Sequence, residues 1–354
     1  MRLSARASAP VHGGIDHQEV RSLGLDPASV VDFSSNLNPF FPSSKLLSGA
    51  CAGAGEYPDA QYSELRGVIA AVHGVSPDCV FAGNGVSEIV HILCRCLPVG
   101  GSVLIPVPTF SEYERAAVIC GARTILCRTD DTLRFDPAFI ASEIRRESPD
   151  LVFLCNPNNP TGLYLSRPEV EEIASAADSV FVIDESYADF VQNPWDSAPL
   201  AGSGNVVILR SLAKFYGLAG IRVGYAISNP HVISVLNAAR PPWNVNSVAC
   251  RAARAVFELS PSALFESKSR LFAARDFLVD ALAATGKPCL PTDTGFFLVK
   301  TPDARLLRDG LLKKGLAVRD CSSFGLASHI RLSARPQKDC ERLVKEWTEI
   351  DREG

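Results

Sequence analysis

Lys214 is the residue whose surroundings in the sequence most favour chemistry. It lies in the segment 210–225, RSLAKFYGLAGIRVGY, among small and apolar side chains. Because desolvation disfavours an ammonium ion, such surroundings lower the pKa of a lysine and favour the neutral amine that forms a Schiff base. Two glycines and Ala219 separate Lys214 from Arg222, and residues this small allow a ligand to approach the backbone closely. The segment therefore indicates covalent chemistry on a carbonyl ligand.

Polar residues also follow three other apolar runs. The turn 83–87, GNGVS, opens a helix, and the free N–H groups and dipole of a helix N-terminus favour an anion such as phosphate. Asp184 follows the run 179–183, where a buried carboxylate is costly without a cationic partner. The turn 156–162, NPNNPTG, leaves side-chain amides available. Each feature alone is more often a structural turn or a helix cap, but together they form a coherent polar set.

The elements that must position these residues are strands and helices in alternation. Uniformly apolar runs are typical of central strands in a sheet that helices cover on both faces, and ligands gather beyond the carboxyl ends of such strands. The pattern predicts strands at 79–82, 102–106, 151–155, 179–183 and 205–209, with helices at 63–72 and 87–97. The fold class is therefore α/β, with a large, doubly wound, mainly parallel sheet.

The chain divides into three predicted parts. Residues 1–45 are rich in Ser, Pro, Gly and Asn and are predicted to form an N-terminal arm. Residues 46–240 carry the α/β pattern. Residues 241–354 are predicted to form a smaller α+β domain, helical at first, with short strands near 295–299 and 330–334.

Composition excludes several classes of function. The 354 residues are 47% hydrophobic and 21% charged, with a formal net charge of −4, so no overall basic surface for nucleic acid or anionic membrane is expected. The eleven cysteines form no CxxC pair, which favours reduced thiols and no metal site. Neither a signal peptide nor a run of 18 apolar residues is present, so we expect a cytoplasmic protein without a membrane span.

Taken together, the motifs resemble those of the fold-type I pyridoxal-phosphate enzymes, over nearly the whole chain and in that family's order. The resemblance rests on Asn159-Pro160-Thr161-Gly162, on Asp184 with Tyr187, and on Ser211-x-x-Lys214 with Arg222. It implies an aspartate-aminotransferase-like fold and pyridoxal 5′-phosphate as the cofactor.

The resemblance also implies a role for each motif residue. Lys214, Asp184 and Tyr187 are the expected catalytic residues: Lys214 carries the cofactor as a Schiff base, and Asp184 keeps the pyridine nitrogen protonated so that the ring is an electron sink. The other implied contacts are hydrogen bonds of Asn159 and Tyr187 to the ring hydroxyl, stacking of Phe110 on the ring, and phosphate contacts of Val86, Ser87, Ser211 and Arg222.

By the same resemblance, Tyr57 reaches the cofactor phosphate from a second subunit, which implies a homodimer with shared active sites. One residue departs from the family pattern. Ala213 stands before the lysine, where relatives commonly have Ser or Thr, and this departure is expected to remove one phosphate hydrogen bond.

Within the family, four segments are more similar to the threonine-phosphate decarboxylases of cobalamin biosynthesis than to the histidinol-phosphate aminotransferases. They are His12-Gly13-Gly14, the stretch 32–39 (DFSSNLNP), Lys214-Phe215-Tyr216, and Arg319-Asp320-Cys321-Ser322. In contrast, Phe40-Phe41-Pro42 departs from the small, glycine-containing stretch usual after that Asn-Pro.

Two arginines near the C-terminus give support that does not depend on the resemblance. In the segment 330–335, IRLSAR, strand alternation places Arg331 and Arg335 on one face. Two forked cations suit a substrate with two anionic groups, whereas the alternative is an exposed edge strand charged against aggregation. By resemblance the substrate-binding residues are His12, Gly13, Asn36, Asn159, Arg319, Arg331 and Arg335, with either Arg331 or Arg335 on the carboxylate and the other on the phosphate.

The expected reaction is decarboxylation of a phosphorylated amino acid, L-threonine O-3-phosphate, to (R)-1-aminopropan-2-yl phosphate and carbon dioxide. A histidinol-phosphate-type aminotransferase remains the alternative, because the orientation of the substrate decides which bond breaks and the sequence does not show that angle. A non-enzymatic, effector-sensing protein of the same fold is a remote third possibility. It would carry a DNA-binding head, and the family pattern already begins by His12.

Overall fold

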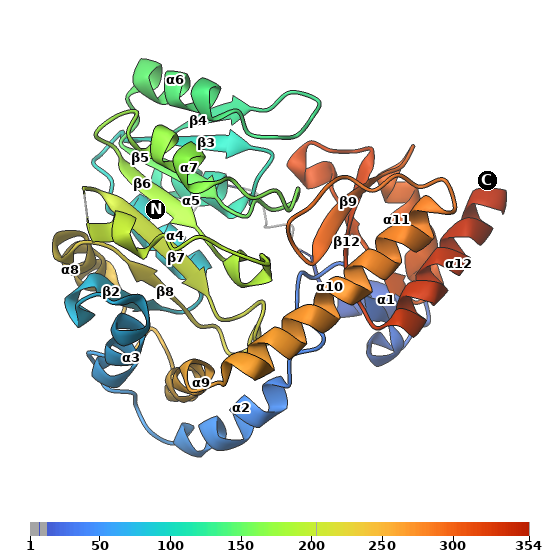
Figure 1. The fold of residues 1–354 in the computed structure, drawn as a ribbon, viewed down its shortest axis with the longest axis horizontal. Coiled ribbons are helices and arrows are strands. Elements are labelled where there is room, and N and C mark those ends of the chain that lie inside the picture. The colour runs from blue at the N-terminus through green and yellow to red at the C-terminus, as the bar shows by residue number, and fades with distance from the viewer. Residues whose placement is uncertain (1–6, 8–12, 203, 354) are drawn as a thin grey trace, which may run out of the picture. The chain divides into compact units, whose positions relative to one another are not determined.

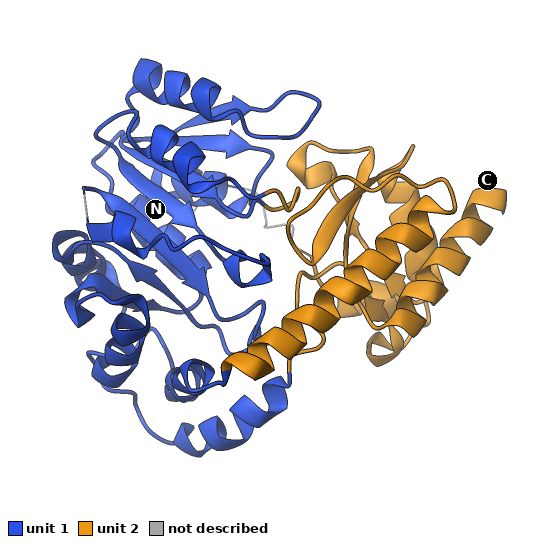
Figure 2. Cartoon of the chain, viewed as in Figure 1, with its two compact units in different colours: residues 1–10, 42–158, 164–260 blue, residues 11–41, 159–163, 261–354 orange. Residues whose placement is uncertain are grey.

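The computed structural model describes residues 7, 13–202 and 204–353 (Figure 1). The chain forms two compact units (Figure 2). Unit 1 comprises residues 1–10, 42–158 and 164–260, and unit 2 comprises residues 11–41, 159–163 and 261–354. Each unit has its own sheet and its own apolar core.

Unit 1 is built on a seven-stranded sheet with the strand order β2-β8-β7-β6-β5-β3-β4. The strands are β2 (Val80–Gly83), β3 (Ser102–Val107), β4 (Arg123–Arg128), β5 (Leu151–Cys155), β6 (Val180–Asp184), β7 (Val206–Ser211) and β8 (Gly224–Ile227). Only β8 runs antiparallel to its neighbours. The predicted mainly parallel α/β sheet is thereby confirmed.

Helices surround this sheet. They are α2 (Ser43–Ala50), α3 (Ser63–His73), α4 (Val86–Arg95), α5 (Glu112–Cys120), α6 (Pro137–Glu147), α7 (Arg167–Ala174), α8 (Pro230–Ala239) and α9 (Ser247–Phe257). Apolar side chains of α4, α5 and α8 share one core with those of the strands, and α6 packs against α7 (Figure 1). Every residue of β5 is buried, as is typical of a central strand in a doubly wound sheet.

Two strands of this sheet were not predicted. The edge strand β4 has the sequence RTILCR, and arginines at both ends interrupt the apolar pattern. The other, β8, has four residues, GYAI, and begins at Gly224. Neither forms an apolar run long enough to distinguish a strand from a loop.

Unit 2 contains a three-stranded antiparallel sheet with the order β11-β12-β9 and a separate parallel pair, β1 with β10. The strands are β1 (Val31–Asp32), β9 (Phe296–Lys300), β10 (Leu316–Ala317), β11 (Arg319–Asp320) and β12 (His329–Ser333). The helices are α1 (His17–Ser22), α10 (Pro261–Ala283), α11 (Ala304–Lys313) and α12 (Gln337–Glu353). Phe33, Phe297, Leu332 and Trp347 belong to a common core.

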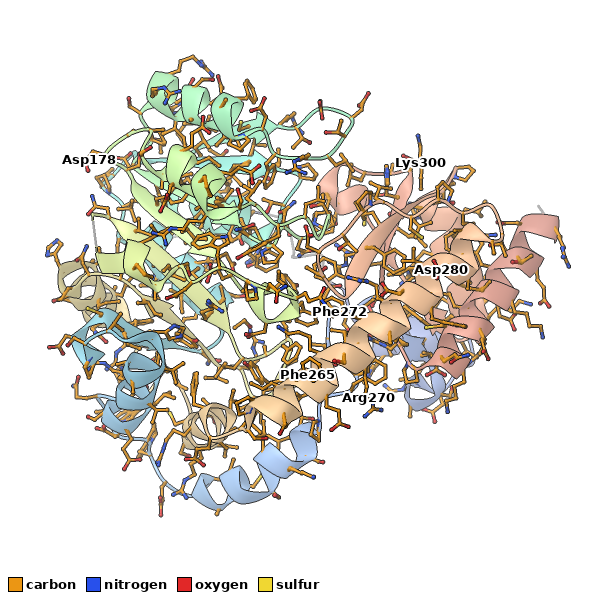
Figure 3. All side chains as sticks on the ribbon, viewed as in Figure 1. Asp178, Phe265, Arg270, Phe272, Asp280 and Lys300 are labelled. Atoms are coloured by element: carbon orange, nitrogen blue, oxygen red, sulfur yellow. The ribbon has the colours of Figure 1, made fainter. Side chains whose placement is uncertain are left out.

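The long helix α10 carries aromatic and charged side chains along its length (Figure 3). Phe265 is 74% exposed, and the guanidinium of Arg270 lies 5.0 Å from the ring centroid of Phe40. Phe40 belongs to the stretch that departs from the family pattern, and this cation–π contact attaches it to α10.

The boundaries of the two compact units differ from those of the three parts predicted from sequence, which are residues 1–45, 46–240 and 241–354. Within the expected N-terminal arm, residues 13–41 belong to unit 2, where β1 pairs with β10, whereas residues 42–45 belong to unit 1. Residues 241–260 belong to unit 1 because α9 packs against α2 and α3. Among the described residues, no helix has both the length and the apolar character that a membrane span requires.

Candidate active site

In unit 1, the polar residues predicted from sequence follow neighbouring strands at one edge of the sheet. Gly83 of β2 lies opposite Gly224 of β8, and Gly224 lies opposite Ser211 of β7. Asp184 ends β6, beside β7 and opposite Cys155 of β5. Because β2, β5, β6 and β7 run parallel to one another, their carboxyl ends meet along this edge, which is where ligands bind in such sheets.

Lys214 follows β7 after a tight turn in which the amide of Ala213 donates to Ser211 Oγ at 3.3 Å. The lysine is half-buried, and the next residue, Phe215, is fully buried with its ring edge-on to Phe190 at 5.4 Å between centroids. A rigid aromatic anchor therefore fixes the backbone that carries the amine.

Asp184 is only 2% exposed. Its Oδ1 accepts a hydrogen bond from the Ser186 amide at 2.9 Å, and its Oδ2 accepts one from Tyr113 Oη at 2.6 Å. Burial raises the pKa of this carboxyl, while the hydrogen bonds from Ser186 and Tyr113 and the charge of Lys214 act against that rise. The carboxylate is thus buried and is oriented by two hydrogen bonds.

Tyr113 was not among the residues predicted from sequence. It stands three positions after Phe110, and residues at that spacing face the same side when a helix begins between them. That spacing is the signal that could have identified it.

An anion cradle lies where α4 begins. Gly85 caps this helix with φ +73° and no side-chain cap, which leaves the amides of the first turn, Val86 and Ser87, available to an anion. A Cβ on Gly85 would lie 2.7 Å from Arg222 Nη2, so only glycine lets the guanidinium approach this closely. A Cβ on Gly224 would lie 3.1 Å from the amide nitrogen of Val86.

These donors fit the phosphate group of the implied cofactor. Arg222 itself adopts φ +62°, a conformation that non-glycine residues rarely adopt, and its Nη1 donates to the carbonyl of Ala219 at 3.1 Å. The guanidinium of Arg222 is therefore held beside the free N–H groups at the start of α4. Both the guanidinium and these N–H groups can bind a phosphate placed between them.

The loops after β3 and β5 are joined to each other. Thr109 Oγ1 donates to Asn158 Oδ1 at 2.8 Å, and Asn158 Nδ2 donates to the carbonyl of Pro108 at 3.0 Å. These bonds fix the loop that carries Phe110, which is half-buried and lies edge-on to Tyr113 at 5.5 Å. Asn158 therefore has a structural role: it joins the two loops. The sequence motif alone did not distinguish this role from the binding role predicted for Asn159.

Two further predicted cofactor residues lie in different surroundings. Tyr187 is 6% exposed, and its ring lies edge-on to Phe190 at 5.8 Å. Tyr57 is 79% exposed, and its ring centroid lies 4.6 Å from that of Trp243. The predicted contact of Tyr57 with a second subunit stays a prediction.

Unit 2 holds a buried cluster of arginines. Arg331 of β12 and Arg319 of β11 are directly opposite each other in the sheet register and are 4% and 8% exposed. Burial lowers the pKa of Arg319, and the charge of Arg331 lowers it further. Since β12 is the central strand of its sheet, the alternative of an exposed, charged edge strand is wrong.

The orientation of Arg331 is set by neutral acceptors. Its Nη1 donates to Asn159 Oδ1, and its Nη2 donates to the carbonyl of Ser34 at 2.7 Å. A Cβ on Gly13 would lie 3.2 Å from Arg331 Nη2 and 2.5 Å from the Ser34 carbonyl, so Gly13 packs directly on this arrangement. His12 lies outside the described residues.

Arg335 is fixed in a similar way. Its Nη1 donates to the carbonyl of Leu37 at 3.2 Å, and its Nη2 donates to the carbonyl of Ser35 at 3.1 Å. Burial lowers its pKa. Asn36, between these two carbonyls in sequence, is 2% exposed.

The structure thus groups the predicted residues within each unit. Unit 1 gathers, at the carboxyl edge of its sheet, Val86, Ser87, Phe110, Asp184, Tyr187, Ser211, Lys214 and Arg222. Unit 2 carries Gly13, Asn36, Asn159, Arg319, Arg331 and Arg335. The residues of unit 1 include an amine, a buried carboxylate and an anion cradle, which fit a phosphorylated aldehyde with a basic ring. The buried arginines of unit 2 fit an anionic ligand.

Comparisons with known proteins identify the family to which the chain is similar. The family described as Aminotransferase class I and II matches residues 28–346. The histidinol-phosphate aminotransferase of Thermoanaerobacter sp. (strain X514) is 36% identical over 297 residues, which cover 83% of this chain and 84% of that protein. The histidinol-phosphate aminotransferase of Symbiobacterium thermophilum is 30% identical over 355 residues, 98% of this chain and 97% of that protein.

Two solved structures extend the comparison. The histidinol-phosphate aminotransferase from Sinorhizobium meliloti, in complex with pyridoxal-5′-phosphate, has a TM-score of 0.88 at 23% identity and covers 98% of this chain and 96% of its own. The L-threonine-O-3-phosphate decarboxylase from Porphyromonas gingivalis has a TM-score of 0.79 at 25% identity and covers 90% of this chain and 99% of its own.

Proposed function

Because this chain belongs to the class I and II aminotransferase family of fold-type I enzymes, with pyridoxal 5′-phosphate as cofactor, we propose that it decarboxylates a phosphorylated amino acid. The proposed substrate is L-threonine O-3-phosphate, and the products are (R)-1-aminopropan-2-yl phosphate and carbon dioxide.

The observation that carries this proposal is the position of Gly13, from the His-Gly-Gly motif, against the buried Arg331 of unit 2. Gly13 belongs to the motif that is most similar to the decarboxylases, and it lies against the guanidinium of Arg331. Arg319 and Arg331 face each other as like charges in a buried sheet, an arrangement that an anionic ligand stabilises. A substrate with both a carboxylate and a phosphate supplies two anions for such forked cations.

The bound cofactor would supply an electron sink for the bond that breaks at the substrate α-carbon. We propose that Lys214 would hold the cofactor through its side-chain amine and that, once free, the same amine would move the proton at the substrate α-carbon. Asp184 would hold a negative charge against the ring nitrogen. The phosphate would be bound by the start of α4 and by Ser211 and Arg222, which anchors the cofactor away from the reacting atoms.

The remaining contacts follow the family pattern. Phe110 would cover one face of the ring, while Tyr187 and Asn159 would donate to its hydroxyl group. Arg331 and Arg335 would bind the carboxylate and phosphate of the substrate, and the direction in which they hold the carboxylate would select the Cα–COO⁻ bond for cleavage.

A histidinol-phosphate-type aminotransferase is the second candidate. The curated relatives at 36% and 30% identity carry that name. In such an enzyme the same arginines would bind the two carboxylates of glutamate. The two candidates therefore share the site and differ in which bond at the α-carbon breaks.

One assay separates the candidates. The enzyme is incubated with O-phospho-L-threonine, with O-phospho-L-serine, and with histidinol phosphate plus 2-oxoglutarate, and carbon dioxide and glutamate are measured. We expect carbon dioxide and an aminoalkyl phosphate from phosphothreonine, without glutamate. Phosphoserine lacks one methyl group, a difference of about 1–3 kcal/mol, and should react more slowly. Glutamate from histidinol phosphate, with no carbon dioxide from either phosphoamino acid, would overturn the decarboxylase proposal.

We further propose a homodimer in which Tyr57 completes the partner's cofactor site. Tyr57 and Trp243 form an exposed aromatic pair, 79% and 48% accessible in the single chain, as is typical of a residue pair that an interface covers. Mixing Tyr57→Ala with Lys214→Ala, each inactive alone, should restore activity, because half of the sites in a heterodimer then carry both intact residues. Lack of recovery under proven subunit exchange would contradict shared sites.

A further inference from the structure

We infer that Tyr113 is a positioning residue for the cofactor, acting through the two residues that would hold its ring, Asp184 and Phe110. This inference rests on the proposed pairing of Asp184 with the ring nitrogen.

The hydroxyl of Tyr113 is directed at Asp184. Its Oη donates to Asp184 Oδ2 at 2.6 Å, and both side chains are buried, with Tyr113 0% exposed. Since the Ser186 amide binds Oδ1, the two bonds together fix the rotation of the carboxylate. A carboxylate held at both oxygens presents a defined direction to a ring nitrogen.

The ring of Tyr113 holds the other residue. Phe110 meets it edge-on, with 5.5 Å between centroids and an interplanar angle of 85°. Tyr113 also stacks on Phe153 of β5, with 4.7 Å between centroids and an interplanar angle of 8°. Tyr113 is therefore packed against the central strand β5, and it contacts both Phe110 and the carboxylate of Asp184.

The Tyr113 hydroxyl is suited to donate a hydrogen bond to Asp184 at every working pH. Burial and the neighbouring charge of Asp184 raise the pKa of Tyr113 well above its ordinary value, so the hydroxyl keeps its proton. A neutral phenol can donate to the carboxylate throughout the working pH range.

A purely structural role predicts a different outcome from a positioning role. Tyr113→Phe removes only the hydroxyl and keeps the ring contacts with Phe110 and Phe153. If the hydroxyl of Tyr113 has only a structural role, this variant loses stability but binds the cofactor as the wild type does. If it positions Asp184, the variant binds the cofactor more weakly and in an altered orientation.

A matched control exists in the same unit. Tyr225 is 4% exposed, and its Oη forms a hydrogen bond with His73 Nε2 at 2.9 Å. Tyr225→Phe therefore also removes one buried phenol hydroxyl, but this hydroxyl has no contact with Asp184 among the described hydrogen bonds.

The experiment titrates apoprotein variants with pyridoxal 5′-phosphate and records the visible circular dichroism of the bound cofactor. Thermal unfolding of each apoprotein checks that it is folded. We expect Tyr113→Phe to raise the Kd of the cofactor about ten- to a hundredfold, the range for loss of a hydrogen bond to a charged group, and to change the dichroism band. We expect Tyr225→Phe to change neither by more than about twofold.

A double-mutant cycle tests whether Tyr113 acts through Asp184. In an Asp184→Ala background, Tyr113→Phe should change the Kd by less than about threefold. A full, additive effect there would overturn the inference, as would a Tyr113→Phe protein that behaves like Tyr225→Phe. If Asp184→Ala alone leaves the Kd unchanged, the proposed pairing of Asp184 with the ring has failed as well. A large effect of Asp184→Ala with none of Tyr113→Phe refutes the role of Tyr113 alone.

Discussion

Replacing Lys214 with alanine is expected to abolish the borohydride-reducible linkage between protein and cofactor and to lower turnover by a factor on the order of 10⁴ to 10⁶. This is the scale at which removal of a covalent catalytic group acts. The physical reason is that Lys214 supplies both the amine that binds the carbonyl and the group that moves the proton at the α-carbon. The phosphate cradle around Gly85 and Arg222 is untouched, so the variant should still bind cofactor non-covalently.

The measurement is mass spectrometry of the borohydride-treated protein, alongside its turnover rate. Lys338→Ala, an exposed lysine on α12, is the control and should keep both the adduct and the activity. A mass increase of unchanged size in Lys214→Ala would show that another amine is the attachment point. Thermal unfolding should show that the variant is folded, since Lys214 is only half-buried.

Replacing Arg331 with alanine is expected to lower kcat/KM for the phosphorylated amino acid by roughly 30- to 5,000-fold. Truncating one partner of a buried, hydrogen-bonded charge pair costs about 2–5 kcal/mol. Because Arg331 would affect the cofactor only through Asn159, cofactor affinity should fall much less than kcat/KM. Steady-state kinetics and cofactor titration on the same preparation measure both quantities.

The variant Arg331→Lys tests whether the positive charge of Arg331 is sufficient or whether the forked shape of its guanidinium is also needed. Lysine keeps the cation but lacks the fork that reaches both Asn159 and the Ser34 carbonyl, so it should recover only part of the lost activity. Arg305→Ala, an exposed arginine on α11, serves as the control for loss of an arginine as such. Unchanged kcat/KM in Arg331→Ala would rule out this arginine as a substrate ligand, whichever of the two reactions the enzyme catalyses.

The sheet of unit 1 was predictable because its central strands are uniformly apolar. All five predicted strands occur, and the polar residues after them, Asp184 and Lys214 among them, lie at the carboxyl edge as expected. Uniformly apolar runs and their alternation with helical segments can be read in the sequence itself, and this alternation favours a parallel sheet, which is why this part could be inferred without coordinates.

The strands β4 and β8 could not be predicted in the same way. Both depend for their strand conformation on hydrogen bonds that exist only in the folded sheet: β4 pairs with β3, and β8 pairs with β7 and with the sequence-distant β2. The same holds for β1, two residues whose partner β10 lies more than 280 positions away in sequence. Tertiary context overrides weak local signals in such elements.

The sequence by itself determined the chemical identity of the site: a lysine among small residues, an aspartate at a strand end, and a glycine turn before a helix. Together these local features, with the family resemblance, specify pyridoxal-phosphate chemistry. Only the tertiary structure decided how these groups are held. Tyr113 reaches Asp184 across 71 residues of chain, and Arg331 faces Arg319 as a buried like-charge pair instead of an exposed edge. Such contacts join residues that are distant in sequence, so no local pattern encodes them, and burial, which sets the strength of each charge interaction, exists only once the chain is packed.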